Sequence, residues 1–245
     1  MTYCCALRLD SGMIFASDSR TNAGVDHIAT FSKMRVYEKK DDRVIVVLSS
    51  GNLAGTQTVI SLLKQRSEVD GAPGNVYSAR TMFDVVLGVS DVMRSVEERD
   101  GKHLEKSDIA FNASLIVGGQ LRGEPMRLFR IYAEGNFIEA GDDTPFLQTG
   151  EAKYGKPIID RVITGRSTSL RDAMKCVLVS FDSTMKSNIS VGLPIDLLWY
   201  PRDSLRVGLQ HRIREGDPYF TMLRSRWGGG LRRVFSELPD PDWLE

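Results

Sequence analysis

Apolar residues at the start of the chain alternate with short clusters of turn residues, a pattern typical of antiparallel strands. Residues 2–9 and 13–18 predict two buried strands, and the Asp-Ser-Gly turn at 10–12 joins them as a hairpin. Residues 33–38 and 43–49 predict a second strand pair around a charged turn. The N-terminal part of the chain is therefore expected to form β structure.

The hydrophobic period then changes from that of strands to that of helices. Apolar positions three and four residues apart predict helices over 54–66 and 80–99. The remaining elements are strands over 109–117, 127–133 and 136–140, helices over 151–164 and 168–184, and strands over 195–200 and 204–210. Runs of strands that alternate with pairs of helices predict an α+β fold, with layered sheets and helices packed outside them.

No composition break, linker or internal repeat divides residues 1–215, which are expected to form one domain. The C-terminal extension, residues 216–245, has a different character. It contains arginines around a tryptophan and three glycines, followed by an acidic end (Arg224, Arg226, Arg232 and Arg233; Trp227; glycines at 228–230; Glu237, Asp240, Asp242 and Glu245). Because its charges are mixed, we expect it to dock on the chain itself or on a neighbouring subunit rather than on nucleic acid.

Lys and Arg together number 32, as do Asp and Glu, so no net charge draws the chain to nucleic acid or membrane. No apolar run reaches membrane-spanning length, and no Lys/Arg-led apolar segment opens the chain, so neither a membrane span nor a signal peptide is expected. Three cysteines do not form a disulfide framework, which predicts a reducing, cytoplasmic compartment. The histidines at 27, 103 and 211 stand apart and no phosphate-binding glycine loop is present, so neither a metal nor a cofactor is expected.

Thr2 becomes a free N-terminal residue once Met1 is removed. Such a threonine carries a hydroxyl nucleophile and an amine base on one Cα, and this combination is an established form of nucleophilic catalysis. Many chains begin with Met-Thr, so Thr2 by itself indicates little. Its interpretation depends on the residues that follow.

Four further positions give Thr2 a chemical context. Asp18 and Arg20 share one face if the second strand continues to Arg20, and Lys33 opens the next strand. Gly51 lies between the fourth strand and the following helix, where backbone N–H groups can stabilise an oxyanion. Taken singly, these residues are better explained as a surface ion pair, a solvated strand start and a tight turn.

In combination, these residues make the chain resemble the proteasome-type β subunits, a family of N-terminal-nucleophile hydrolases, and most closely its bacterial Anbu branch. The motifs that carry the resemblance are Thr2, the turn at 10–12, Ala-Ser-Asp-Ser-Arg at 16–20, Ser32 and Lys33, Ser-Ser-Gly at 49–51, Thr56 and Gln57, and the stretches 148–157 and 187–194. The resemblance spans nearly the whole chain. It implies a four-layer αββα sandwich, with two antiparallel sheets between helices, and a threonine-type endopeptidase.

The resemblance also implies roles for individual residues. Thr2 would be the nucleophile and, through its amine, the base. Lys33 would lower the pKa of these neighbouring groups by its positive charge, and Asp18 would hold Lys33 in place. The N–H of Gly51 would form the oxyanion hole. Substrate contacts would come from Arg20, Thr21, Ser49, Leu53 and Thr149.

The later half of the chain gives weaker matches. In the family a Ser, an Asp and a second Ser support the nucleophile, and the matching residues here are Thr149, Asp182, and Ser187 or Ser190. The interval between Asp18 and Lys33 is one residue shorter than in proteasome β subunits, and the later Asp-to-Ser interval is longer. Ser190 could instead contribute backbone carbonyl oxygens, for instance to a cation.

Two alternatives remain open from the sequence: a non-catalytic assembly subunit, and an N-terminal-nucleophile amidohydrolase that acts on a small amide. A non-catalytic ring member normally lacks the threonine or its lysine, and this chain has both. Because the family assembles into rings or spirals, the expected partners are a peptide or protein substrate and further copies of the chain. An ATP-dependent unfolding partner is compatible with the resemblance, although no motif in the chain indicates one.

Overall fold

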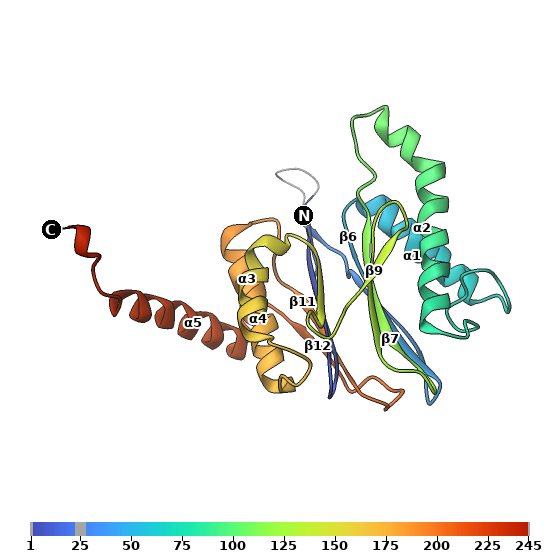
Figure 1. Ribbon diagram of the computed structural model, residues 1–245. Helices are drawn as coiled ribbons and strands as arrows, with labels where there is room; N and C mark the ends of the chain where they lie inside the picture. Colours follow the sequence, from blue (N-terminus) through green and yellow to red (C-terminus); the bar gives the residue numbers. More distant parts are fainter. Residues whose placement is uncertain (1, 23–27, 245) are drawn as a thin grey trace.

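The computed structural model describes residues 2–22 and 28–244, so His27 lies outside the described residues. Two five-stranded antiparallel sheets lie face to face, and helices cover both outer faces (Figure 1). This arrangement confirms the expected α+β, four-layer αββα sandwich.

The first sheet is built around the N-terminal hairpin. β1 (Tyr3–Leu9) and β2 (Gly12–Asp18) pair as predicted, with Leu9 opposite Gly12. The later strands β10 (Phe146–Gly150), β11 (Ile195–Pro201) and β12 (Leu209–Ile213) complete the sheet in the order β10-β1-β2-β11-β12. The start of the chain therefore lies between strands that arrive more than a hundred residues later.

The second sheet follows chain order and carries the first two helices. Its strands are β5 (Met34–Lys39), β6 (Arg43–Ser50), β7 (Ser114–Leu121), β8 (Arg127–Ile131) and β9 (Phe137–Glu139). Helices α1 (Leu53–Ser67) and α2 (Met82–Glu105) pack on its outer face (Figure 1). A capping box between Thr81 and Asp84 starts α2, and its buried valines follow the helical period that forms one apolar face.

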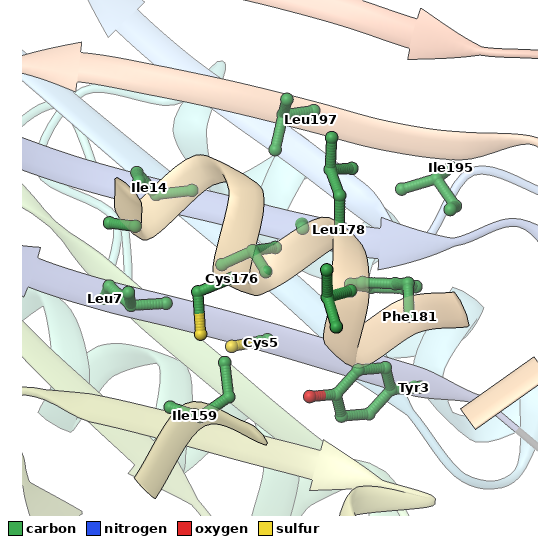
Figure 2. Close-up of a cluster of buried hydrophobic side chains, with 14 of the residues drawn as sticks. Tyr3, Cys5, Leu7, Ile14, Ile159, Cys176, Leu178, Phe181, Ile195 and Leu197 are labelled. Atoms are coloured by element: carbon green, nitrogen blue, oxygen red, sulfur yellow. The ribbon is translucent and has the colours of Figure 1, made fainter. Parts of the chain in front are cut away.

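Helices α3 (Ala152–Val162) and α4 (Leu170–Ser187) cover the outer face of the first sheet. Figure 2 shows Tyr3, Cys5 and Leu7 of β1 facing Cys176 and Phe181 of α4. The rings of Tyr3 and Phe181 lie with centroids 4.6 Å apart. Since alternate residues of a strand point to opposite faces, the intervening β1 residues face the second sheet and form a separate core between the sheets.

Several boundaries differ from the sequence-based expectation. The pattern predicts neither the hairpin of β3 (Arg20–Asn22) and β4 (Ile28–Thr30) nor β10, because strands of three to five residues carry too little periodicity. The strand expected over 109–117 begins at Ser114, since α2 continues to Glu105. The last strand begins at Leu209 rather than at 204, since the intervening residues form a turn.

The C-terminal extension forms helix α5 (Pro218–Ser236) and a short 3₁₀ helix (Asp242–Leu244). Phe220 and Leu223 anchor the start of α5 in the core, while the rest of the helix extends away from the sandwich (Figure 1). Phe235 and Trp243 are 77% and 80% exposed. In the described part of the chain, no helix combines the length and the apolar character needed to cross a membrane.

Candidate active site

Thr2 lies directly before β1 and is held by the turn that follows β10. Its carbonyl oxygen accepts a hydrogen bond from the Glu151 N–H at 2.7 Å. Gly150 has φ +80°, and a Cβ there would collide with the Thr2 carbonyl, so this approach requires glycine. Thr2 is buried, with 7% of the residue exposed. The backbone of Thr2 is therefore fixed although the residue lies at the end of a strand.

A buried ion pair lies next to Thr2. Asp18, the last residue of β2, is fully buried, and Lys33 is 6% exposed. The Asp18 Oδ1 accepts a hydrogen bond from Lys33 Nζ at 2.8 Å and another from the Tyr3 N–H at 3.1 Å. Lys33 Nζ also donates to the Arg20 carbonyl oxygen at 2.6 Å. One carboxylate thus connects the lysine to the residue after the threonine.

The electrostatics of the pair depend on both partners. Burial raises the pKa of the Asp18 carboxyl, and the charge of Lys33 together with the N–H groups of Tyr3 and Gly192 opposes that rise. Charge-assisted hydrogen bonds of this length are among the stronger ones in proteins. Asp18 therefore depends on Lys33 for its ionised state, and Lys33 depends on Asp18 for its position.

Gly51 provides an N–H group at the junction of β6 and α1. Its φ of +100° and the crowding by the Asn112 carbonyl leave no space for a Cβ. Asn52 caps α1 by accepting the Gly55 N–H at 3.0 Å. Within residues 2–22 and 28–244 the Gly51 N–H has no acceptor. A free N–H before a helix N-terminus can stabilise negative charge, as an oxyanion hole requires.

Thr2, Ser50 and Gly51 lie where two pockets meet. The first pocket has a volume of about 350 Å³ and is lined by Thr2, Thr21, Phe31, Ser32, Lys33, Arg35, Ser49, Ser50, Gly51, Leu53, Thr56, Gln57, Ile60 and Ser61. The second has a volume of about 640 Å³ and includes Asn112, Ser114, Arg130, Thr149 and Glu151. We refer to them as the Lys33 pocket and the Arg130 pocket. An extended substrate can therefore bind across Thr2 with one side chain in each pocket.

The residues expected to contact substrate are distributed between these pockets. Thr21, Ser49 and Leu53 line the Lys33 pocket, and Thr149 lines the Arg130 pocket. The Oγ1 of Thr149 lies 2.8 Å from the Oγ of Ser50. Arg20 contributes its carbonyl to Lys33, but its guanidinium turns away and donates to the Ile189 carbonyl at 3.1 Å. Arg20 therefore holds Lys33 through its backbone carbonyl, and its side chain lines neither pocket.

The late candidates are Asp182, Ser187 and Ser190. The Asp182 carboxylate accepts a hydrogen bond at 2.6 Å from Arg224 of α5. Ser187 ends α4, and the Ser190 N–H donates to Asn188 Oδ1 at 2.9 Å. None of the three lines either pocket at Thr2. Their catalytic roles stay predictions without a direct contact to support them.

Two supporting residues escape the sequence patterns. Asp196 of β11 accepts a hydrogen bond from Ser32, the neighbour of Lys33, at 3.1 Å, and pairs with Arg212 at 3.0 Å. Gly192 lies against Arg20, and its N–H faces Asp18. Both come from the last quarter of the chain. Gly192 belongs to the stretch 187–194 that carries the resemblance, but no local pattern connects either residue with the Lys33 and Asp18 region.

The described residues contain no group of three or more His, Cys, Asp or Glu side chains placed to hold a metal ion. The groups that the structure places at Thr2 are a hydroxyl, a lysine–aspartate pair and a backbone N–H. Two facing antiparallel sheets between helices, with a threonine at the start of the first strand, define the class of proteasome-like β subunits with the N-terminal-nucleophile hydrolase fold.

Solved structures identify the branch of this class. Anbu (ancestral beta-subunit) from Yersinia bercovieri is 50% identical, with a TM-score of 0.90, over 98% of this chain and 99% of that one. Anbu from Pseudomonas aeruginosa, described as a helical assembly, is 48% identical, with a TM-score of 0.91, over 98% of both chains. Anbu from Hyphomicrobium sp. strain MC1 is 45% identical, with a TM-score of 0.90, over 98% and 99%. The chain belongs to the Anbu family. No protein-family model matches it, and neither does any curated protein.

Proposed function

We propose that this chain is a threonine-type endopeptidase whose nucleophile is Thr2 after removal of Met1, a residue outside the described part of the chain. The observation that carries the proposal is the position of the Asp18 carboxylate. It binds both the Lys33 ammonium and the N–H of the residue next to Thr2, and Thr2 and Lys33 line one pocket. A charged lysine in that position favours the deprotonated forms of a neighbouring amine and hydroxyl.

The proposed reaction has two steps. The Thr2 amine takes the hydroxyl proton as Oγ attacks the substrate carbonyl carbon, and the Gly51 N–H stabilises the resulting oxyanion. The C–N bond then breaks, the leaving amine takes the proton, and an ester on Thr2 remains. Water, deprotonated by the same amine, attacks the ester, and the proton returns to Oγ as the acid product leaves.

The alternative of a small amide substrate makes a different demand on the site. A small amide needs one enclosed pocket, whereas Thr2 here adjoins two pockets of about 350 and 640 Å³. This arrangement favours substrates that extend on both sides of the cleaved bond.

Peptides and small amides can be compared directly as substrates. We expect internally quenched peptides of eight or more residues to be hydrolysed, and single amino-acid amides to be hydrolysed at least about tenfold less efficiently, because remote contacts contribute to catalysis. The measurement is kcat/KM for both substrate types, with the Thr2→Ala variant as control. Equal or better use of the amides would favour the amidohydrolase alternative.

We further propose that the chain works as a homo-oligomer, either a ring or a spiral. The helical assembly described for the Pseudomonas aeruginosa relative supports this. So does α5, which has exposed apolar residues along its length (Met222, Leu231, Val234 and Phe235).

The three cysteines are buried and free, which supports a reducing, cytoplasmic location for the protein. An ATP-dependent partner stays an expectation drawn from the resemblance alone.

The oligomer proposal predicts the effect of a charge on α5. We expect Phe235→Glu to move the protein toward the monomer mass, because a charge in an apolar interface is costly. Val69→Glu is the matched control, since Val69 is 58% exposed just beyond the C-terminal end of α1 and its replacement should leave the mass unchanged. The measurement is size-exclusion chromatography with light scattering at micromolar concentration. A wild-type monomer would refute the proposal.

A further inference from the structure

The Lys33 pocket has an unbalanced charge. Among the fourteen described residues that line it, the charged ones are Lys33 and Arg35, and no Asp or Glu is among these fourteen. The Lys33 charge is compensated by Asp18 at 2.8 Å. Arg35 forms no ion pair within residues 2–22 and 28–244, and its Nη1 donates only to the carbonyl of the adjacent Met34 at 3.1 Å. One uncompensated guanidinium therefore borders the pocket.

The rest of the lining is suited to a side chain with an apolar stem. Phe31, Leu53 and Ile60 supply apolar surface, and Gln57 and Ser61 of α1 add polar groups. Arg35 lies on the edge strand β5 and is exposed, so its charge lies on the solvent side of the pocket. A guanidinium pairs well with a carboxylate because it offers several N–H groups in one plane.

We propose that Arg35 makes the Lys33 pocket selective for an acidic side chain, glutamate above all, next to the cleaved bond. A glutamate can place its methylene groups against the apolar wall and its carboxylate on Arg35. A lysine or arginine in the same position would face Arg35 with a like charge. The inference names the substrate class of the proposed peptidase and therefore rests on that function.

The test compares internally quenched peptides that differ only by Glu, Gln or Lys at each of the two positions flanking the cleaved bond. Because Arg35 is exposed, we expect kcat/KM for Glu to exceed that for Gln by about fivefold at one of these positions. Arg35→Ala should bring the ratio to about one, Arg35→Lys should keep part of it, and Arg35→Glu should favour Lys. High salt should reduce the ratio in the wild type.

The matched control is Arg161→Ala. Arg161 is an exposed arginine of α3 that donates to the Pro157 carbonyl and lines neither pocket at Thr2, so its loss should leave the Glu/Gln ratio unchanged. A ratio near one in the wild type, or a ratio that survives in Arg35→Ala, would overturn the inference while leaving the peptidase intact.

A second measurement separates the inference from the proposed function. Fluorescence anisotropy with the Thr2→Ala variant measures binding of the labelled Glu and Gln peptides without cleavage. If the wild type hydrolyses no peptide, the proposed function fails, and binding still decides the pocket's preference. The inference is supported if the Thr2→Ala variant binds the Glu peptide more tightly than the Gln peptide and the double variant Thr2→Ala/Arg35→Ala does not. Equal binding of both peptides by Thr2→Ala overturns it.

Discussion

Replacement of Thr2 by alanine should lower kcat/KM for peptide hydrolysis by a factor on the order of 1000 or more, because removal of a nucleophile eliminates the covalent route. The fold should remain, since the hydrogen bond that holds Thr2 uses its backbone carbonyl. The measurement is hydrolysis of quenched peptides, with thermal unfolding recorded in parallel.

Thr2→Ser is the matched control for this experiment. Serine keeps a hydroxyl and, once N-terminal, an amine in the same positions, so measurable hydrolysis should remain. If Thr2→Ala hydrolysed peptides as fast as the wild type, the nucleophile would have to be another group, and the proposed mechanism would be wrong.

Replacement of Lys33 by alanine should reduce both stability and activity. The substitution leaves the fully buried Asp18 carboxylate without its counter-charge, and breaking a buried ion pair in this way costs about 3–5 kcal/mol in the free energy of unfolding. Activity should fall as well, since Lys33 borders Thr2 in the same pocket. Urea-induced unfolding measures the first effect and peptide hydrolysis measures the second.

A surface ion pair provides the control for this prediction. Lys156 pairs with Asp160 at 2.7 Å on α3, and both side chains are about half exposed. Lys156→Ala should therefore change the free energy of unfolding by only about 0.3–0.5 kcal/mol. Combining Lys33→Ala with Asp18→Ala should recover part of the loss, because the unpaired charge is removed. A cost for Lys33→Ala as small as that of Lys156→Ala would contradict the buried-pair interpretation.

The sequence is most informative about the site residues that lie close together along the chain. The hairpin of β1 and β2 brings Asp18 back toward Thr2, and β5 and β6 bring in Lys33 and Gly51, so the first 51 residues contain the core of the candidate site. Each of these elements has a clear alternating pattern and a recognisable turn. Most strands of the two sheets and four of the five α-helices of the described residues follow from patterns of the same kind.

The sequence is least informative where the site depends on distant segments. Thr149 reaches Ser50 through β10, a strand of only five residues, and Asp196 reaches Ser32 from β11. No periodic pattern specifies which strands become neighbours, because pairing across a sheet is decided by packing of the whole fold. Asp182 pairs with Arg224 in the C-terminal helix, a contact that no sequence pattern specifies, and its catalytic role stays a prediction.

The central claim is that the mature chain presents a reactive N-terminal threonine. The most direct test is the intact mass of the purified protein before and after treatment with a peptide epoxyketone, which reacts with a hydroxyl and a free amine on the same residue. We predict loss of Met1 and one stable adduct in the wild type, with no adduct in Thr2→Ala. Retention of Met1 in the assembled protein, or a processed chain that forms no adduct, would contradict the claim.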